Sequence, residues 1–314
     1  MFFASGIVDT TLFVRQPNSF DMDEILTTLS TRFPGDLESI RTIGQFRDWA
    51  LAQPRLAFFE PKSVILSERG KPRLVSLSAA DLNSWRRHVA DGSLVRLHGL
   101  ETAALSQIVA DRRTAAMVLI RAHMEIAGLA AYCHEKLFDA GRDGALDRLA
   151  DVVHQVYFGS SMRIQTKKTP ELADYLFEEV YPIRPTDFIR SMDRFASGGD
   201  PAYTRHLLVY GLLSDFAHPV TRLAFFEILR ESPEGWTLRY KLEDPLDAEA
   251  FKIAVELLLG NMRVGYACAA MLAKCEIVPS PEGGMLLRPP TPDEAGKIWL
   301  RFLETSTAGK PPAA

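Results

Sequence analysis

One stretch near the C-terminal end, residues 248–275, is apolar almost all the way round a helix: AEAFKIAVELLLGNMRVGYACAAMLAKC. A helix of this kind is stable in water only where other elements surround it. Asp247 directly precedes the stretch and is a residue type that caps helix N-termini. The pattern therefore predicts a central helix, and the rest of the chain has to supply the helices that cover it.

Apolar residues recur at helical spacing through most of the chain. The expected helices are residues 21–33, 37–53, 78–92, 105–139, 146–158, 170–181, 185–196, 201–217 and 293–303, with a further turn or helix at 219–230. Two β-rich runs, SVILS and RLVSLS, flank a segment with Gly70 and Pro72, which is typical of a hairpin. Residues 235–242 are also strand-like, and the segment after Cys275 predicts a loop or a short hairpin.

These patterns predict a fold that is mainly α: an antiparallel helical bundle with a small α+β N-terminal portion that contains a β-hairpin. We expect residues 1–100 to form that N-terminal region and 101–276 to form the bundle. Residues 277–305 are expected to form a loop and a C-terminal helix, and 306–314 a disordered tail.

The composition is that of an ordinary soluble globule, with 47% hydrophobic and 24% charged residues. The formal net charge of −4 lacks the basic excess that is usual in nucleic-acid-binding domains. The chain begins without the basic segment and long apolar core of a signal peptide. The longest apolar window, 114–132, carries Arg121, His123 and Glu125, which argues against a lone membrane span. We therefore expect a cytoplasmic protein.

The three cysteines, Cys133, Cys268 and Cys275, all lie in apolar helical segments. An odd number without a CxxC motif argues against a disulfide framework or a structural zinc site, so we expect buried free thiols. Motifs for nucleotide phosphates, for the serine nucleophile of α/β-hydrolases and for metalloproteases are absent from the sequence. We therefore expect neither a cofactor nor a metal.

Two polar clusters inside apolar helices are the candidate site. Arg121 and Glu125 are four residues apart in LIRAHMEIAG, and Ser214 and His218 are four apart in YGLLSDFAHP, so each pair shares one helix face. Charges inside an apolar helix are costly unless they have partners, which predicts that the two faces meet.

Two interpretations of this meeting remain open. In the first, Arg121 binds an anion and His218 moves a proton, with Glu125 and Ser214 orienting them, which suits acid–base chemistry on RNA. In the second, the same four residues form a buried polar network that holds two helices in register.

The two motifs R-x-x-x-E and Y-x-x-x-S-x-x-x-H-P, here Arg121 with Glu125 and Tyr210 with Ser214, His218 and Pro219, resemble helical domains related to the HEPN superfamily. The resemblance is closest to uncharacterised bacterial helical proteins and covers about residues 100–275 of the printed sequence.

The resemblance implies a helical bundle that is often dimeric, in a toxin–antitoxin or phage-defence system. Many members are metal-independent ribonucleases, and others only bind a partner protein, RNA or another ligand. The active ones carry an Arg five to seven residues before the His. The chain departs from that pattern, because Leu213, Leu212 and Gly211 occupy those positions before His218. The resemblance therefore implies a non-catalytic partner- or ligand-binding module, with the ribonuclease as the alternative.

Overall fold

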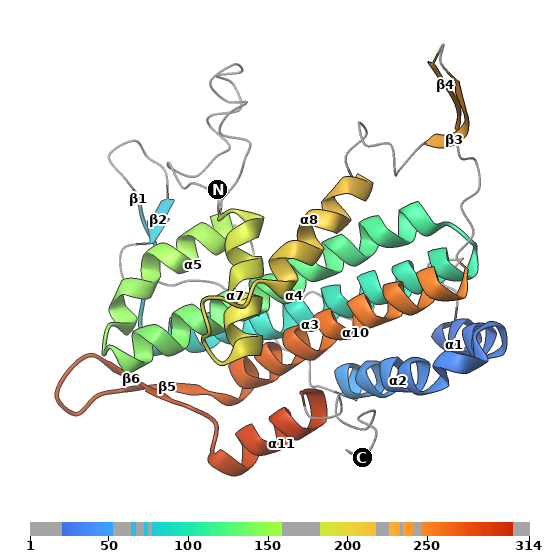
Figure 1. Cartoon of the computed structure of the whole chain (residues 1–314). Coiled ribbons are helices and arrows are strands. Elements are labelled where there is room, and N and C mark those ends of the chain that lie inside the picture. Colours follow the sequence, from blue (N-terminus) through green and yellow to red (C-terminus); the bar gives the residue numbers. More distant parts are fainter. Residues whose placement is uncertain are drawn as a thin grey trace, which may run out of the picture.

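The computed structural model describes residues 21–52, 64–66, 72–74, 77–158, 183–217, 226–232, 235–240 and 247–303. The described part of the chain is mainly helical and carries short antiparallel hairpins, which confirms the expected α class (Figure 1). The hairpin predicted in the N-terminal portion is present as well.

Three long helices pack side by side at the centre of the structure: α3 (Ala79–Val109), α4 (Arg113–Arg142) and α10 (Ala248–Lys274). Arg86 near the start of α3 donates to the carbonyl of Leu272 near the end of α10 at 2.6 Å, so these two helices run antiparallel. At Gly265 of α10, an added Cβ would lie 2.9 Å from Leu97 and 3.0 Å from Ala127. The helices meet there without room for a side chain.

α10 is the helix that the sequence placed at the centre. Of its 27 residues, 16 are buried, and Asp247 caps it by accepting the backbone N–H of Ala250 at 2.7 Å. α3 begins with a capping box, in which Ser78 and Asp81 satisfy each other's backbone N–H groups. The cap expected at Asp247 is therefore confirmed.

The helix expected over 105–139 was wrong at its N-terminal end. The chain turns at 110–112, with Asp111 at φ 57°, and residues 105–109 belong to α3. Polar residues, Asp111, Arg112 and Arg113, occupy the turn, but the buried Ile108 and Ala116 on either side are eight residues apart and so keep helical spacing across it. Periodicity alone therefore joined two helices into one.

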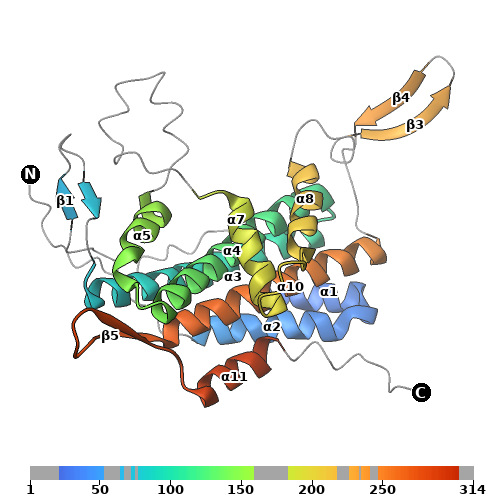
Figure 2. The same cartoon turned by 60° about the vertical axis from the view of Figure 1, so that its left-hand side comes forward.

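Further helices lie on two opposite sides of the central three (Figures 1 and 2). On one side lie α1 (Met22–Arg32), α2 (Leu37–Ala52) and α11 (Pro292–Phe302). On the other lie α7 (Pro185–Ser197) and α8 (Arg205–Ala217), both against α4. α5 (Leu149–Phe158) follows a short 3₁₀ turn after α4.

Three two-stranded antiparallel hairpins complete the described elements. They pair β1 (Val64–Leu66) with β2 (Pro72–Leu74), β3 (Phe226–Ser232) with β4 (Gly235–Tyr240), and β5 (Glu276–Pro279) with β6 (Met285–Arg288). The expected turn or helix at 219–230 was wrong over 226–230, which form β3. That strand is stabilised by a partner later in the sequence, and its own spacing does not reveal this.

The helix expected at 170–181 and the tail expected at 306–314 lie outside the described residues. Residue 100, where the sequence placed its first domain boundary, lies inside the continuous helix α3.

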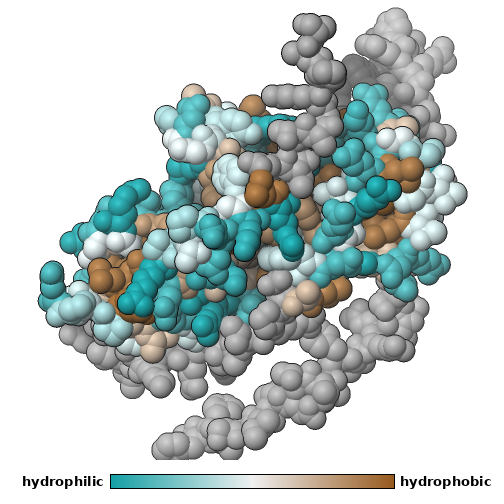
Figure 3. Space-filling model, turned by 90° about the horizontal axis from the view of Figure 1, so that it is seen from below, coloured by the Kyte–Doolittle hydropathy of each residue, from teal (hydrophilic) through white to brown (hydrophobic). Residues whose placement is uncertain are grey.

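α4 and α10 are, by length and composition alone, apolar enough to cross a bilayer. In the structure, 61% and 72% of their most apolar windows are buried inside the protein. The face that carries α2 and α11 shows small apolar patches among hydrophilic residues (Figure 3).

Candidate functional site

The Arg121 side of α4 faces α8, as the polar clusters predicted, and the group that it meets there is Tyr210. A guanidinium N–H of Arg121 donates to the Tyr210 hydroxyl at 2.9 Å. The same hydroxyl donates to Glu125 Oε1 at 2.8 Å. Arg121 and Glu125 also form an ion pair of 3.3 Å along α4. A cation, a carboxylate and a hydroxyl from two segments of the chain therefore converge.

Ser214 does not join this cluster. Its hydroxyl donates to the backbone carbonyl of Tyr210 at 2.7 Å, within its own helix. Such a bond to the preceding turn is common for a serine inside a helix, because the short side chain reaches that carbonyl. His218 lies outside the described residues. Of the four candidate residues, the structure therefore brings Arg121 and Glu125 together and places Ser214 apart from them.

The charged groups of the cluster are paired with each other. Arg121 lies 5.1 Å from the centre of the Tyr210 ring, so it makes a cation–π contact as well as the hydrogen bond. Burial raises the pKa of Tyr210; the hydrogen bond from Arg121 opposes this rise and the hydrogen bond to Glu125 adds to it. The Arg121 and Glu125 side chains are 25% and 33% exposed. Because Glu125 already balances the charge of Arg121, the cluster has little net charge with which to attract an anion.

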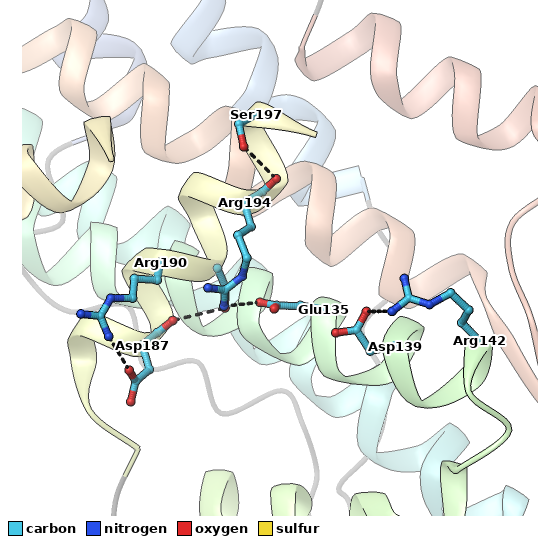
Figure 4. A network of polar contacts seen from close by, with 8 residues as sticks. Glu135, Asp139, Arg142, Asp187, Arg190, Arg194 and Ser197 are labelled. Carbon is cyan, nitrogen blue, oxygen red and sulfur yellow. Dashed lines mark hydrogen bonds and ion pairs between the residues drawn. The ribbon is translucent and has the colours of Figure 1, made fainter. Parts of the chain in front are cut away.

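α7 is held tightly on α4 and sets the position of α8. An added Cβ at Gly128 would lie 3.0 Å from the backbone of Phe188, so only glycine permits this approach. The Phe188 ring packs edge-to-face on Tyr132 at 5.5 Å. Figure 4 shows Arg194 of α7 reaching Glu135 of α4, where the two form a 2.7 Å ion pair. Although burial alone would raise it, the pKa of Glu135 is lowered by hydrogen bonds from α7.

Asp193 at the end of α7 caps α8 from outside that helix. Its carboxylate accepts the backbone N–H of His206 at 2.7 Å and that of Leu207 at 3.1 Å. It also contacts Nδ1 of the His206 ring at 2.9 Å. The Asp193 side chain is 4% exposed, so the first turn of α8 is anchored to α7 by a buried group. Burial lowers the pKa of His206 although Asp193 opposes this, which favours the neutral ring.

Other buried titratable groups lie away from this cluster. His123 is fully buried, and neither ring nitrogen has a hydrogen-bond partner in the described structure. Burial lowers its pKa to about 3. Glu101 is also fully buried and accepts the Tyr266 hydroxyl at 3.0 Å. Burial raises the pKa of Glu101 to about 8, so this carboxyl group is mostly protonated at neutral pH.

The cysteines are buried free thiols, as expected: Cys133, Cys268 and Cys275. Among the residues that the structure describes, no three His, Cys, Asp or Glu side chains gather in a way that would hold a metal ion.

The outward face of α8 is exposed and carries two large apolar side chains. Leu208 and Leu212 are 72% and 48% exposed, and Arg205, Gly211 and Asp215 beside them are exposed too. Tyr210 and Leu213 on the opposite face are buried against the rest of the protein. Large apolar side chains are normally buried, and on this helix two of them face the solvent.

Sequence reasoning missed three parts of this site. Tyr210 appeared only as part of a motif, although a tyrosine on the buried side of a helix usually needs a partner for its hydroxyl. Asp193 and His206 gave no signal, because their contact depends on how two helices meet. The exposure of Leu208 and Leu212 could not be read from a helix whose apolar residues point in every direction.

Comparison with protein-family models, with curated proteins and with solved structures gave no match to this chain.

Proposed function

We propose that this protein is a non-catalytic helical binding module that binds a protein partner on the outward face of α8. The observation that carries the proposal is the pair Leu208 and Leu212, whose large apolar side chains are exposed on a helix that is otherwise well anchored. Exposed apolar side chains on a rigid element are typical of protein–protein contacts.

The polar cluster supports this function by fixing the helix. Arg121 and Glu125 hold α8 through the Tyr210 hydroxyl, and Asp193 anchors its first turn. A surface that is ordered before binding loses less conformational entropy when the partner docks. In this account the charged residues of α4 position the binding surface and do not act on a substrate.

The alternative is the metal-independent ribonuclease, with Arg121 as the anion-binding group and His218 as the acid–base. Its support is that the Arg121 side chain is 25% exposed and can be reached from solvent. The pairing of Arg121 with Glu125 weighs against it, because a neutralised guanidinium attracts phosphate weakly.

Site-specific photo-cross-linking tests the binding function. A photoreactive amino acid replaces Leu208 in the full chain inside cells, and a matched variant carries it at Lys252 of α10, which is exposed and polar. We expect a discrete cross-linked protein product from position 208 and none from position 252. Equal products from both positions, or none from 208, would contradict the proposal. RNA cleavage by the purified protein that Arg121→Ala abolishes without unfolding would establish the alternative.

A further inference from the structure

The exposed stripe of α8 has a two-fold pattern. Arg205, Leu208, Leu212 and Asp215 are spaced by three, four and three residues, which places them on one stripe of a helix. The stripe is symmetric about position 210: the two leucines lie inside, with one charge of each sign outside. The outer residues are about 15 Å apart along the helix axis.

The two charges are placed against the dipole of their own helix. Arg205 is the first residue of α8, where the helix end is partially positive, and Asp215 lies near its partially negative end. The first turn of α8 carries no acidic residue and the last turn no basic one. This placement of the two charges therefore lowers the stability of the isolated helix.

A second α8 running in the opposite direction would offset this loss of stability. When two antiparallel α8 helices pair with position 210 at the symmetry axis, Leu212 of the neighbour lies over Leu208, and Asp215 of the neighbour lies beside Arg205. Each charge then lies near an opposite charge and near the favourable end of the neighbouring helix dipole. Asp215 also has an interaction within its own chain, and its exposed carboxylate has room for a second partner.

We propose that the partner bound on the outward face of α8 is a second copy of this chain, docked with the two α8 helices antiparallel. This inference rests on the proposed function and names the partner of the same surface. Because α8 has only 13 residues, the interface is small and the dimer is expected to be weak and concentration-dependent.

Charge reversal tests the inference with the purified full chain in sedimentation velocity, at about 5 to 100 µM, the range suited to small interfaces. Arg205→Asp creates two like-charge pairs across the two-fold axis, and Asp215→Arg does the same. We expect either change to raise the dimer dissociation constant about tenfold or more. The double variant Arg205→Asp/Asp215→Arg restores both pairs and should dimerise about as well as the wild type.

Lys252→Asp is the matched control, because Lys252 is exposed on α10 and the change in net charge equals that of Arg205→Asp. We expect it to leave dimerisation unchanged. A wild-type protein that stays monomeric at every concentration overturns the inference, and so does a dimer that all four variants leave equally strong.

The two proposals fail separately. A monomeric wild type that still gives a cross-link from position 208 to a different protein overturns self-association and leaves the binding function standing. Absence of any cross-link from position 208 overturns the binding function itself.

Discussion

The Tyr210 hydroxyl of α8 accepts a hydrogen bond from Arg121 of α4 at 2.9 Å. It donates a hydrogen bond to Glu125 Oε1 at 2.8 Å, so one phenol links both charged groups of α4 to α8. Tyr210→Phe removes this link and leaves Arg121 and Glu125 with only each other. We expect a loss of about 1 kcal/mol in the free energy of unfolding, which is modest because both charged groups are partly exposed. Urea unfolding measures it.

Tyr203→Phe is the control for that change, because no hydrogen bond of the Tyr203 hydroxyl is present in the described structure. It should shift the free energy of unfolding by less than about 0.5 kcal/mol. Equal losses in the two variants would mean that the Tyr210 hydroxyl contributes nothing specific.

Asp193→Ala should destabilise the protein more than a surface capping change. It removes a buried acceptor from the backbone N–H groups of His206 and Leu207 and from the His206 ring. We expect a loss of about 2 kcal/mol in chemical unfolding. Asp200→Ala removes an exposed acceptor from the backbone N–H of Ala202 and should lose about 0.5 kcal/mol. A larger loss of stability for Asp200→Ala than for Asp193→Ala would contradict the anchoring of α8 by α7.

Two glycines of α10 should respond in opposite directions to alanine. At Gly265 the new Cβ would meet Leu97 at 2.9 Å and Ala127 at 3.0 Å, so Gly265→Ala should destabilise the protein by about 1 to 3 kcal/mol. At Gly260 nothing lies within 4 Å, and Gly260→Ala should stabilise it by about 0.5 to 1 kcal/mol through helix propensity. Thermal unfolding of both variants decides whether the three central helices meet at Gly265.

Much of this could be predicted from the sequence, and the limits are physical. The burial of α10 and its Asp247 cap follow from a segment that is apolar on every face and from a side chain that acts within one turn. The meeting of α4 with α8 followed from the cost of burying Arg121 and Glu125 without partners. The identity of the meeting group did not follow, because Ser214 can satisfy its hydroxyl locally and Tyr210 cannot.

The sequence also could not predict the pairing of β3 with β4 or the turn at 110–112. A strand is stabilised by a neighbour, and one half of a hairpin carries no local sign of it. The polar residues Asp111, Arg112 and Arg113 at the turn are equally compatible with the exposed face of one continuous helix, and it is the positive φ of Asp111 that separates the two helices. Asp193 and His206 are of the same kind, since their contact exists only once α7 and α8 are placed.

His123 should make stability fall in acid. Its pKa is about 3 in the folded protein and about 6.5 in the unfolded chain, so between these values the unfolded chain binds the proton. Stability is therefore lost as pH falls through this window, by up to about 1.4 kcal/mol per pH unit for this group. His123→Leu removes that contribution and leaves no ring nitrogen without a partner. Urea unfolding at several pH values should show the variant gaining on the wild type below about pH 6.

Glu101 should make stability fall as the pH rises, which is the opposite of the effect of His123. Its pKa is about 8 in the folded protein and about 4.3 in the unfolded chain, so the folded state holds the extra proton between them. Stability is lost as pH rises through this window. Glu101→Gln keeps an acceptor for the Tyr266 hydroxyl without titrating, so its advantage over the wild type should grow from about pH 5 to about pH 8. An advantage that is the same at every pH would show that Glu101 is ionised in both states.

Arg121 and Tyr210 act together to hold α8 in place, and a double-mutant cycle measures how strongly the two side chains are coupled. Arg121→Met, Tyr210→Phe and the double variant are compared with the wild type in urea unfolding. We expect a favourable coupling free energy of about 1 kcal/mol between the two side chains. If the stability losses of the two single variants add up to that of the double variant within about 0.3 kcal/mol, the two side chains act independently. That result would contradict their joint role in fixing α8.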